Sequence, residues 1–314
     1  MFKTGIYSLH QIRDDHTYKA LLGGLRKVSV SLYDQLEGRA DQAALQERIL
    51  LLFADDRGAF KRTYSNRVPD FDAKIVALLH DGGFGRPLKV HDIAVSDART
   101  ACDLYCRLKE EGFDPEYVAS DYQPIVTVLE KGPFRVALSS NQQILEVVVP
   151  PLVINVVKPD SGLYYPLNAL VGFFARKVIG PAVVSLWRRG NAQAREVKLI
   201  CARAQMLERE NPSFRVLRHN VIDPWKENAA FDFIRALNIL NPQYFSPEVF
   251  QTVMRNLHAS LREGGLLAAG SNQEGQSEVN GVILRRKGNS FVQIWQSGSG
   301  LPVDISPFCD APLK

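Results

Sequence analysis

The sequence predicts an α/β protein with a mostly parallel sheet of seven strands. After residue 87, short apolar runs alternate with helical segments, a pattern typical of parallel strands joined through helices. Near the end of the chain, strand-like runs at 281–286 and 290–295 flank a Lys-Gly-Asn turn, which predicts a C-terminal antiparallel hairpin at one edge of the sheet. The 314 residues, 46% hydrophobic and 23% charged, exclude a collagen-like, coiled-coil or disordered chain.

The first 82 residues predict a helical N-terminal domain, because their apolar residues recur at helical spacing. A run rich in glycine at 81–87 then interrupts regular structure, so we expect a linker there and a second domain at 88–314. The helices expected in the N-terminal domain span 18–36, 41–53 and 72–80.

The second domain begins with a buried strand and continues as alternating strands and helices. Glycines at 112 and at 264–265 follow two of its helical segments and are typical stop signals. The strands expected before the terminal hairpin span 88–95, 117–121, 214–220, 231–237 and 266–270. The helices expected between them span 100–111, 197–210 and 247–261.

One interval does not fit this alternation, because about 70 extra residues separate the second strand from the next helix. Four strand-like runs in this interval predict a β-rich insertion at about 122–192. An apolar stretch at 163–187 follows these runs, but it carries Arg176 and Lys177 near its middle. A membrane span needs roughly 20 apolar residues with few charges, so we expect at most peripheral membrane contact, through 163–190.

Charge narrows the choice of partners. The net charge of +4 is too small to indicate nucleic acid. Between residues 176 and 218, however, ten Lys or Arg stand against three Glu, which favours either an anionic substrate or lipid surface, or a solvated helix face.

Four cysteines are too few for a disulfide scaffold, and no Cys or His nearby completes a metal site. The N-terminal residues lack the continuous apolar core of a signal peptide, so we expect a cytoplasmic protein.

Small and polar residues follow the first three strands of the second domain. In open α/β sheets, ligands bind at the carboxyl ends of the strands. The loop at 92–98 has alanine or serine at alternate positions, which lets backbone approach a ligand. Asp121 ends the second strand, where a carboxylate can accept hydrogen bonds from a ribose diol, and Asn220 follows the third, where an amide can bond an adenine edge. The alternative interpretation involves no ligand: the loop at 92–98 is then an ordinary strand-to-helix turn, and Asp121 either caps a helix or is solvated.

Three stretches carry a family resemblance. Residues 202–220 look like the helix and third strand of the class I S-adenosylmethionine-dependent methyltransferases, and 231–245 with 261–271 look like their fourth and fifth strands. The latter part is particularly similar to the chemotaxis-receptor methyltransferases, which also have a helical N-terminal domain and a β insertion, although that insertion sits elsewhere in the fold. The resemblance covers about 88–298 and implies a Rossmann-like sheet with S-adenosylmethionine as cofactor.

The resemblance also implies a role for each candidate residue. The family has glycine at positions 94, 96 and 98, where this chain has Ala, Ser and Ala. The chain is therefore expected either to transfer a methyl group to an unidentified small-molecule or protein acceptor, or to be a non-catalytic binding or scaffold protein on a degenerate methyltransferase fold. The implied contacts are with the methionine part for Asp92, Ala94 and Ser96, with the ribose for Asp121, with adenine for Asn220 and Val221, and with the sulfonium side for Ala236 and Asn238.

A dinucleotide-dependent oxidoreductase is a further alternative, but its G-x-G-x-x-G loop is absent after the first strand. Methyl transfer needs a general base only for some acceptors, and sequence spacing assigns no catalytic base. The candidates for such a base are His219, Asp223, Tyr244 and His258.

Overall fold

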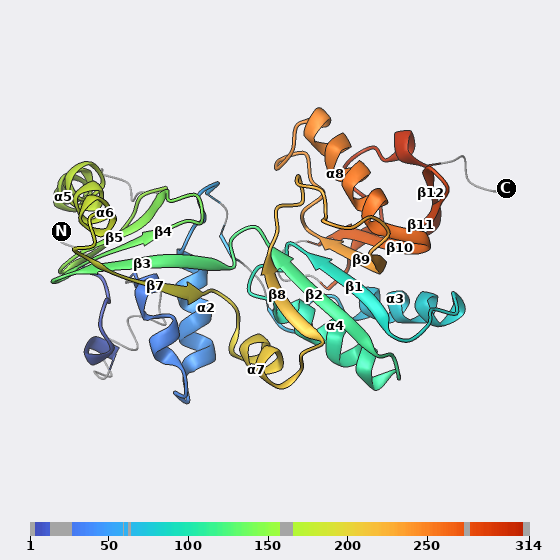
Figure 1. The fold of residues 1–314 in the computed structure, drawn as a ribbon, viewed down its shortest axis with the longest axis horizontal. Helices are drawn as coiled ribbons and strands as arrows, with labels where there is room; N and C mark the ends of the chain where they lie inside the picture. The colour runs from blue at the N-terminus through green and yellow to red at the C-terminus, as the bar shows by residue number, and fades with distance from the viewer. Residues whose placement is uncertain are drawn as a thin grey trace. The chain divides into compact units, whose positions relative to one another are not determined.

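The computed structural model describes residues 4–12, 27–58, 60–61, 64–157, 166–272 and 277–309. The chain forms two compact units (Figure 1). This division differs from the expected one, because the β-rich insertion joins the N-terminal segment in one unit and the last part of the expected N-terminal domain joins the other. Unit 1 comprises Met1–Arg62 and Gln123–Ala202, and unit 2 comprises Thr63–Tyr122 and Arg203–Lys314.

Unit 2 contains the seven-stranded sheet, which confirms the predicted fold class. Its strand order is β12-β11-β10-β9-β1-β2-β8, and only the pairs β10–β11 and β11–β12 are antiparallel. The five parallel strands run in the order 3-2-1-4-5 of a Rossmann-like sheet, so the order reverses between β1 and β9. The strands are β1 (Leu88–Ile93), β2 (Pro115–Asp121), β8 (Phe214–Arg218), β9 (Phe231–Leu237), β10 (Leu261–Ser271), β11 (Asn280–Lys287) and β12 (Ser290–Ser297).

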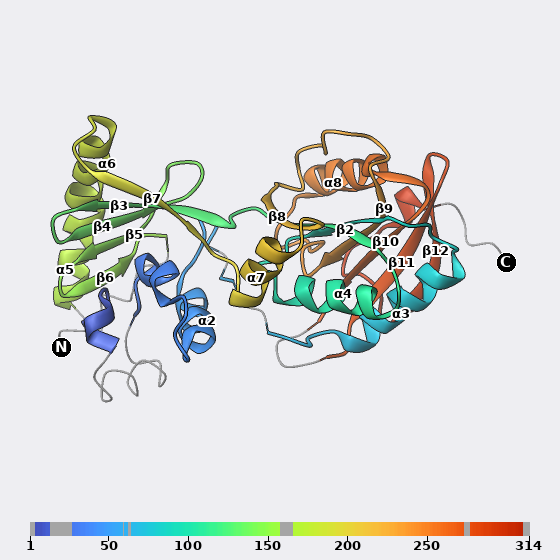
Figure 2. The ribbon, with the colours of Figure 1, turned by 60° about the horizontal axis from the view of Figure 1, so that its bottom comes forward.

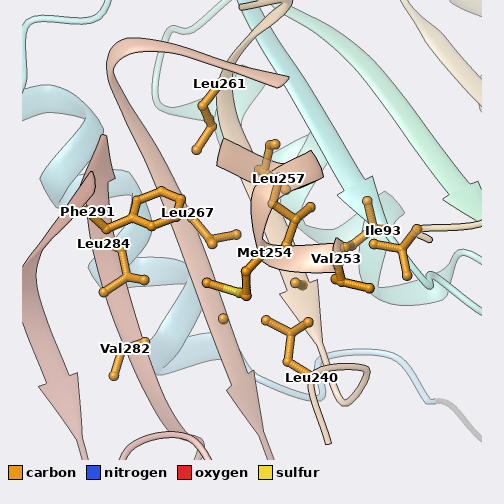
Figure 3. Close-up of a cluster of buried hydrophobic side chains, with 14 of the residues drawn as sticks. Ile93, Leu240, Val253, Met254, Leu257, Leu261, Leu267, Val282, Leu284 and Phe291 are labelled. Carbon is orange, nitrogen blue, oxygen red and sulfur yellow. The ribbon is translucent and has the colours of Figure 1, made fainter. Parts of the chain in front are cut away.

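Helices cover both faces of this sheet (Figure 2). Helix α8 begins at Pro247, behind Ser246, whose hydroxyl accepts the Val249 N–H. Its apolar side, with Met254 at the centre, packs on β10, β11 and the start of β12 (Figure 3). The helices of this unit are α3 (Pro69–Asp81), α4 (Arg99–Glu110), α7 (Ala202–Glu210) and α8 (Pro247–Ser260).

Helix α3 was expected in the N-terminal domain but packs with the sheet of unit 2. Asp72 lies 2.7 Å from the Arg235 guanidinium of β9, and the Phe71 ring lies 5.7 Å from the Trp295 ring of β12. This ion pair is buried, so helix α3 and the sheet belong to the same core. The boundary between the two units therefore lies before α3 and not after it.

Unit 1 is built on an antiparallel five-stranded sheet of order β6-β5-β4-β3-β7. Its outer strand β7 replaces the beginning of the expected helix at 197–210, because Val197 is buried in the sheet and pairs with Val126. The strands are β3 (Ile125–Lys131), β4 (Phe134–Leu138), β5 (Ile144–Val149), β6 (Leu152–Asn155) and β7 (Gln193–Lys198).

The two faces of this sheet bury alternate residues against different segments (Figure 2). Val126 and Val128 pack with the N-terminal segment, which contains α2 (Gln42–Leu52). Leu129 packs with the long apolar helix, formed by α5 (Pro166–Phe174), a π-helical turn (Ala175–Ile179) and α6 (Gly180–Arg188).

The helix expected at 18–36 lies partly outside the described residues, and its remainder differs from the prediction. Residues 30–36 form two short 3₁₀ turns. The buried Glu146 carboxylate of β5 accepts hydrogen bonds from the Ser29 hydroxyl (2.7 Å) and the Val30 N–H (3.1 Å). These bonds fix the backbone against the sheet and divert it from a continuous α-helix.

Candidate functional site

The loop after β1 has an unusual backbone. Ala94, Ser96 and Ala98 have φ values of 58°, 59° and 66°, in the left-handed region that favours glycine. An L-residue with a β-carbon pays about 1–2 kcal/mol for this conformation. These are the three small residues that the sequence predicts to bring backbone close to a ligand, and strain of this kind is concentrated at functional sites.

The end of β2 holds this loop in place. The Val95 N–H donates to the Ser120 carbonyl at 3.1 Å, and the Ser96 N–H donates to Oδ2 of Asp121 at 2.8 Å. Asp121 and Ser96 are both half-buried. The Asp121 carboxylate thus lies directly beside the strained loop.

The loop after β8 joins the same edge. The His219 N–H donates to the Asp121 carbonyl at 3.0 Å, and half-buried Asn220 follows. Val221 is 9% exposed and packs in the core. The Asn256 amide of α8 donates to the carbonyl of Ile222 at 2.7 Å, which anchors this loop to the helix.

The ends of β9 and β10 are joined by two side-chain amides. Asn238, with φ of 58°, exchanges hydrogen bonds with Asn272: the Asn272 N–H donates to Asn238 Oδ1 at 3.0 Å, and Asn238 Nδ2 donates to Asn272 Oδ1 at 3.1 Å. Arg67 Nε donates to the same Asn272 oxygen at 3.0 Å. Sequence reasoning missed Asn272 and Arg67, although the place of Asn272 after a predicted strand could have pointed to it.

Two expected site residues are corrected, because both lie inside the protein. Asp92 is 2% exposed, and Arg235 donates to its two oxygens at 3.0 and 2.6 Å. The Tyr117 hydroxyl donates to the same carboxylate at 2.8 Å. Ala236 is fully buried in the core beneath α8. Both residues precede the point where their strands leave the sheet, so strand packing determines their surroundings.

The sequence-predicted residues therefore separate into two groups. Those whose side chains are half-buried at the carboxyl edge of the sheet are Ala94, Ser96, Asp121, Asn220 and Asn238. Those buried in the core are Asp92, Val221 and Ala236.

An aromatic cluster lies behind the Asp121 edge. His91 Nε2 lies 2.8 Å from the Ser120 hydroxyl, and the His91 ring packs at 4.6 Å from Trp225 and 5.6 Å from His219. Burial, together with the nearby His219, lowers the pKa of His91 to about 3, so His91 is neutral at physiological pH. Burial also lowers the pKa of His219.

The other three base candidates differ in their surroundings. Asp223 is exposed in the loop after β8, where its N–H donates to the Asn220 carbonyl at 2.8 Å, Tyr244 is exposed, and His258 lies on α8 with its ring 5.0 Å from Phe291. We assign the role of general base to none of these residues.

A cavity of about 330 Å³ lies at the opposite, amino-terminal edge of the sheet. Lys89 near the start of β1 and Asp232 near the start of β9 line it. Ligands of open α/β sheets bind at the carboxyl edge, so this cavity is not the cofactor site expected from the fold.

No family model and no curated protein matches this chain. Among solved structures, it is similar to the CMeT domain of the citrinin polyketide synthase (14% identity, TM-score 0.28, 61% of this chain and 30% of that one). It is also similar to a TehB-like SAM-dependent methyltransferase from Corynebacterium glutamicum (12%, 0.29, 64% and 62%).

A third similar structure is the 1,6-didemethyltoxoflavin-N1-methyltransferase of Burkholderia thailandensis with bound S-adenosylhomocysteine (14%, 0.31, 87% and 69%). The chain thus spans less than two thirds of the length of the first two proteins.

Proposed function

We propose that the chain binds S-adenosylmethionine at the carboxyl edge of the unit 2 sheet and transfers its methyl group to an acceptor. The observation that carries this proposal is the left-handed loop at Ala94, Ser96 and Ala98, held against Asp121. Three strained residues in a row of five do not help the chain to fold, and such strain is retained where a ligand needs the backbone in that form.

The residues at this edge fit such a cofactor. Backbone of the loop would face the methionine part, the Asp121 carboxylate would accept hydrogen bonds from the ribose hydroxyls, and the Asn220 amide would face the adenine edge. Asn238 would lie at the sulfonium side, where Asn272 holds its amide in place.

The three β-carbons of the loop differ in whether they face a ligand. Ala98 is fully buried, so its β-carbon lies inside the protein and takes no space from a ligand. Only Ala94 and Ser96 present β-carbons at the half-buried edge. These two groups also favour the alternative function, a binding or scaffold protein that has lost its cofactor.

Methyl transfer requires little acid–base catalysis by protein side chains. When bound, the sulfonium of S-adenosylmethionine would supply an electrophilic methyl group for the acceptor. The residues of the site would hold the methyl donor in one orientation and exclude water. Alignment of donor and acceptor in this way supplies a large part of the rate acceleration of a two-reactant transfer.

Some of the basic residues between 176 and 218, whose excess favoured an anionic partner, form ion pairs within the chain. Arg195 pairs with Asp34 and Glu130, and Arg203 pairs with Asp103 at 2.7 Å. These cations are engaged by carboxylates of the chain, and we propose no charge for the acceptor, which would be a small molecule or a protein.

Calorimetric titration with S-adenosylhomocysteine and S-adenosylmethionine tests the proposal. We expect micromolar binding of both by the parent chain and about 10- to 150-fold weaker binding by Asp121→Ala, the effect of one lost hydrogen bond to a charged group. Asp114→Ala is the matched control, because this exposed Asp precedes the amino end of the same strand. Absence of binding by the parent chain would instead support the scaffold function.

A further inference from the structure

The outer face of the long helix in unit 1 is unusually apolar. Eight large hydrophobic side chains are exposed in the described part of the chain, and five of them lie on this helix. We call this surface the α5–α6 face. It is formed by Leu167, Leu170, Phe173, Phe174 and Val178, each 50–56% exposed.

Four of the five side chains form one stripe, and the fifth lies beside it. Leu167, Leu170, Phe174 and Val178 follow each other at spacings of three and four residues, so they lie on one side of the helix. The Phe173 ring packs against the Phe174 ring at 5.8 Å. The opposite side, with Ala175 and other small or branched residues, is buried on the five-stranded sheet. The helix is therefore apolar on both sides, and only one of them is covered within the unit.

This packing distinguishes a surface helix from a membrane span. Within the described residues, Ala169–Arg188 is long and apolar enough to cross a membrane by length and composition, with a mean hydropathy of 1.6. However, its inner side is fixed along β3–β6 (Figure 2). A helix held in this way can enter a bilayer only with its exposed side, lying parallel to the surface.

The charge on the same helix is entirely positive. Residues 166–189 contain no Asp or Glu, whereas Arg176, Lys177, Arg188 and Arg189 are basic. None of these four cations forms an ion pair with a residue that the structure describes. Exposed leucine and phenylalanine beside uncompensated lysine and arginine are the composition of a helix that binds anionic lipid.

We propose that the α5–α6 face docks on an anionic lipid surface. The apolar stripe would enter the boundary between headgroups and acyl chains, while the long basic side chains reach the phosphate level. A second copy of the chain is a poorer occupant, because a two-fold contact of this face would bring the same cations together without a carboxylate between them. The proposal does not depend on cofactor binding.

Vesicle sedimentation of the full chain tests this docking. We expect binding to phosphatidylcholine vesicles that contain about one third phosphatidylserine, and little binding to pure phosphatidylcholine, with a loss of binding in high salt. The double variant Phe173→Ser with Phe174→Ser should bind at least ten-fold less. Met206→Ser is the matched control, because Met206 is 48% exposed outside this face.

The folding of each variant is checked by circular dichroism and by its melting temperature. Equal binding by the parent and the double variant would overturn the proposal, and so would absence of binding to both kinds of vesicle. A dimer of the parent chain that the double variant dissociates, seen by sedimentation equilibrium, would also overturn it and assign the face to self-association.

Discussion

Replacement of Ala94 by glycine tests the strain of the loop directly. The φ of Ala94 is 58°, a conformation that destabilises the folded chain by about 1–2 kcal/mol with alanine but not with glycine. Glycine adds about 0.5–1 kcal/mol of backbone entropy to the unfolded chain. We therefore expect Ala94→Gly to stabilise unit 2 by about 0.5–1 kcal/mol, or about 1–4 °C in melting temperature.

Two other alanines serve as controls for the same change. Ala77 is exposed in the middle of α3 with ordinary helical backbone, so Ala77→Gly should destabilise by about 1 kcal/mol. Ala98 has φ of 66° but is fully buried, and the loss of its methyl group, about 0.8 kcal/mol, should cancel most of the relief.

The assay is thermal and urea unfolding of the three variants, followed by circular dichroism. The expected order of stability is Ala94→Gly above the parent, Ala98→Gly close to the parent and Ala77→Gly below it. If Ala94→Gly were as destabilising as Ala77→Gly, the loop would not be strained, and the main support for the ligand site would be lost.

The remaining predictions concern buried charges. Burial raises the pKa of Glu146 from 4.5 to about 7. Between these two pH values the folded chain therefore keeps a proton that the unfolded chain releases. The free energy of unfolding should fall by about 3 kcal/mol as pH rises from 4.5 through 7. Glu146→Gln should lack this loss, and equal slopes of urea midpoint against pH in parent and variant would contradict the assignment. Arg235→Leu should destabilise by about 3–5 kcal/mol, because it leaves the carboxylates of Asp72 and Asp92 buried without a counter-charge; a variant as stable as the parent would refute this network. Asp92→Asn should lower stability but leave the affinity for S-adenosylhomocysteine within about two-fold in the fraction that stays folded, whereas a loss of affinity without a loss of stability would place Asp92 back in the cofactor site.

Residues that depend on local chain direction could be predicted from the sequence. Asp121 follows a short apolar strand, and parallel strands end at one edge, so its place beside the first loop follows from alternation alone. Likewise, the small residues at 94, 96 and 98 lie at the positions where the backbone turns left-handed.

Residues whose role depends on distant partners could not be predicted in this way. Asp92 pairs with Arg235, 143 positions away, and no local pattern indicates that the two meet. The same reason explains why α3 was assigned to the wrong part of the chain and why β7 was missed. Val197 becomes a strand residue only because β3, about 70 residues earlier, offers an edge for pairing.

A crystal structure of the chain with S-adenosylhomocysteine would test the central claim most directly. We expect the ligand to lie across the loop at 94–98, with its ribose hydroxyls within hydrogen-bond distance of Asp121 and its adenine beside Asn220. Crystals grown at saturating ligand with that loop unchanged and empty, or with the ligand bound elsewhere, would contradict the proposed cofactor site.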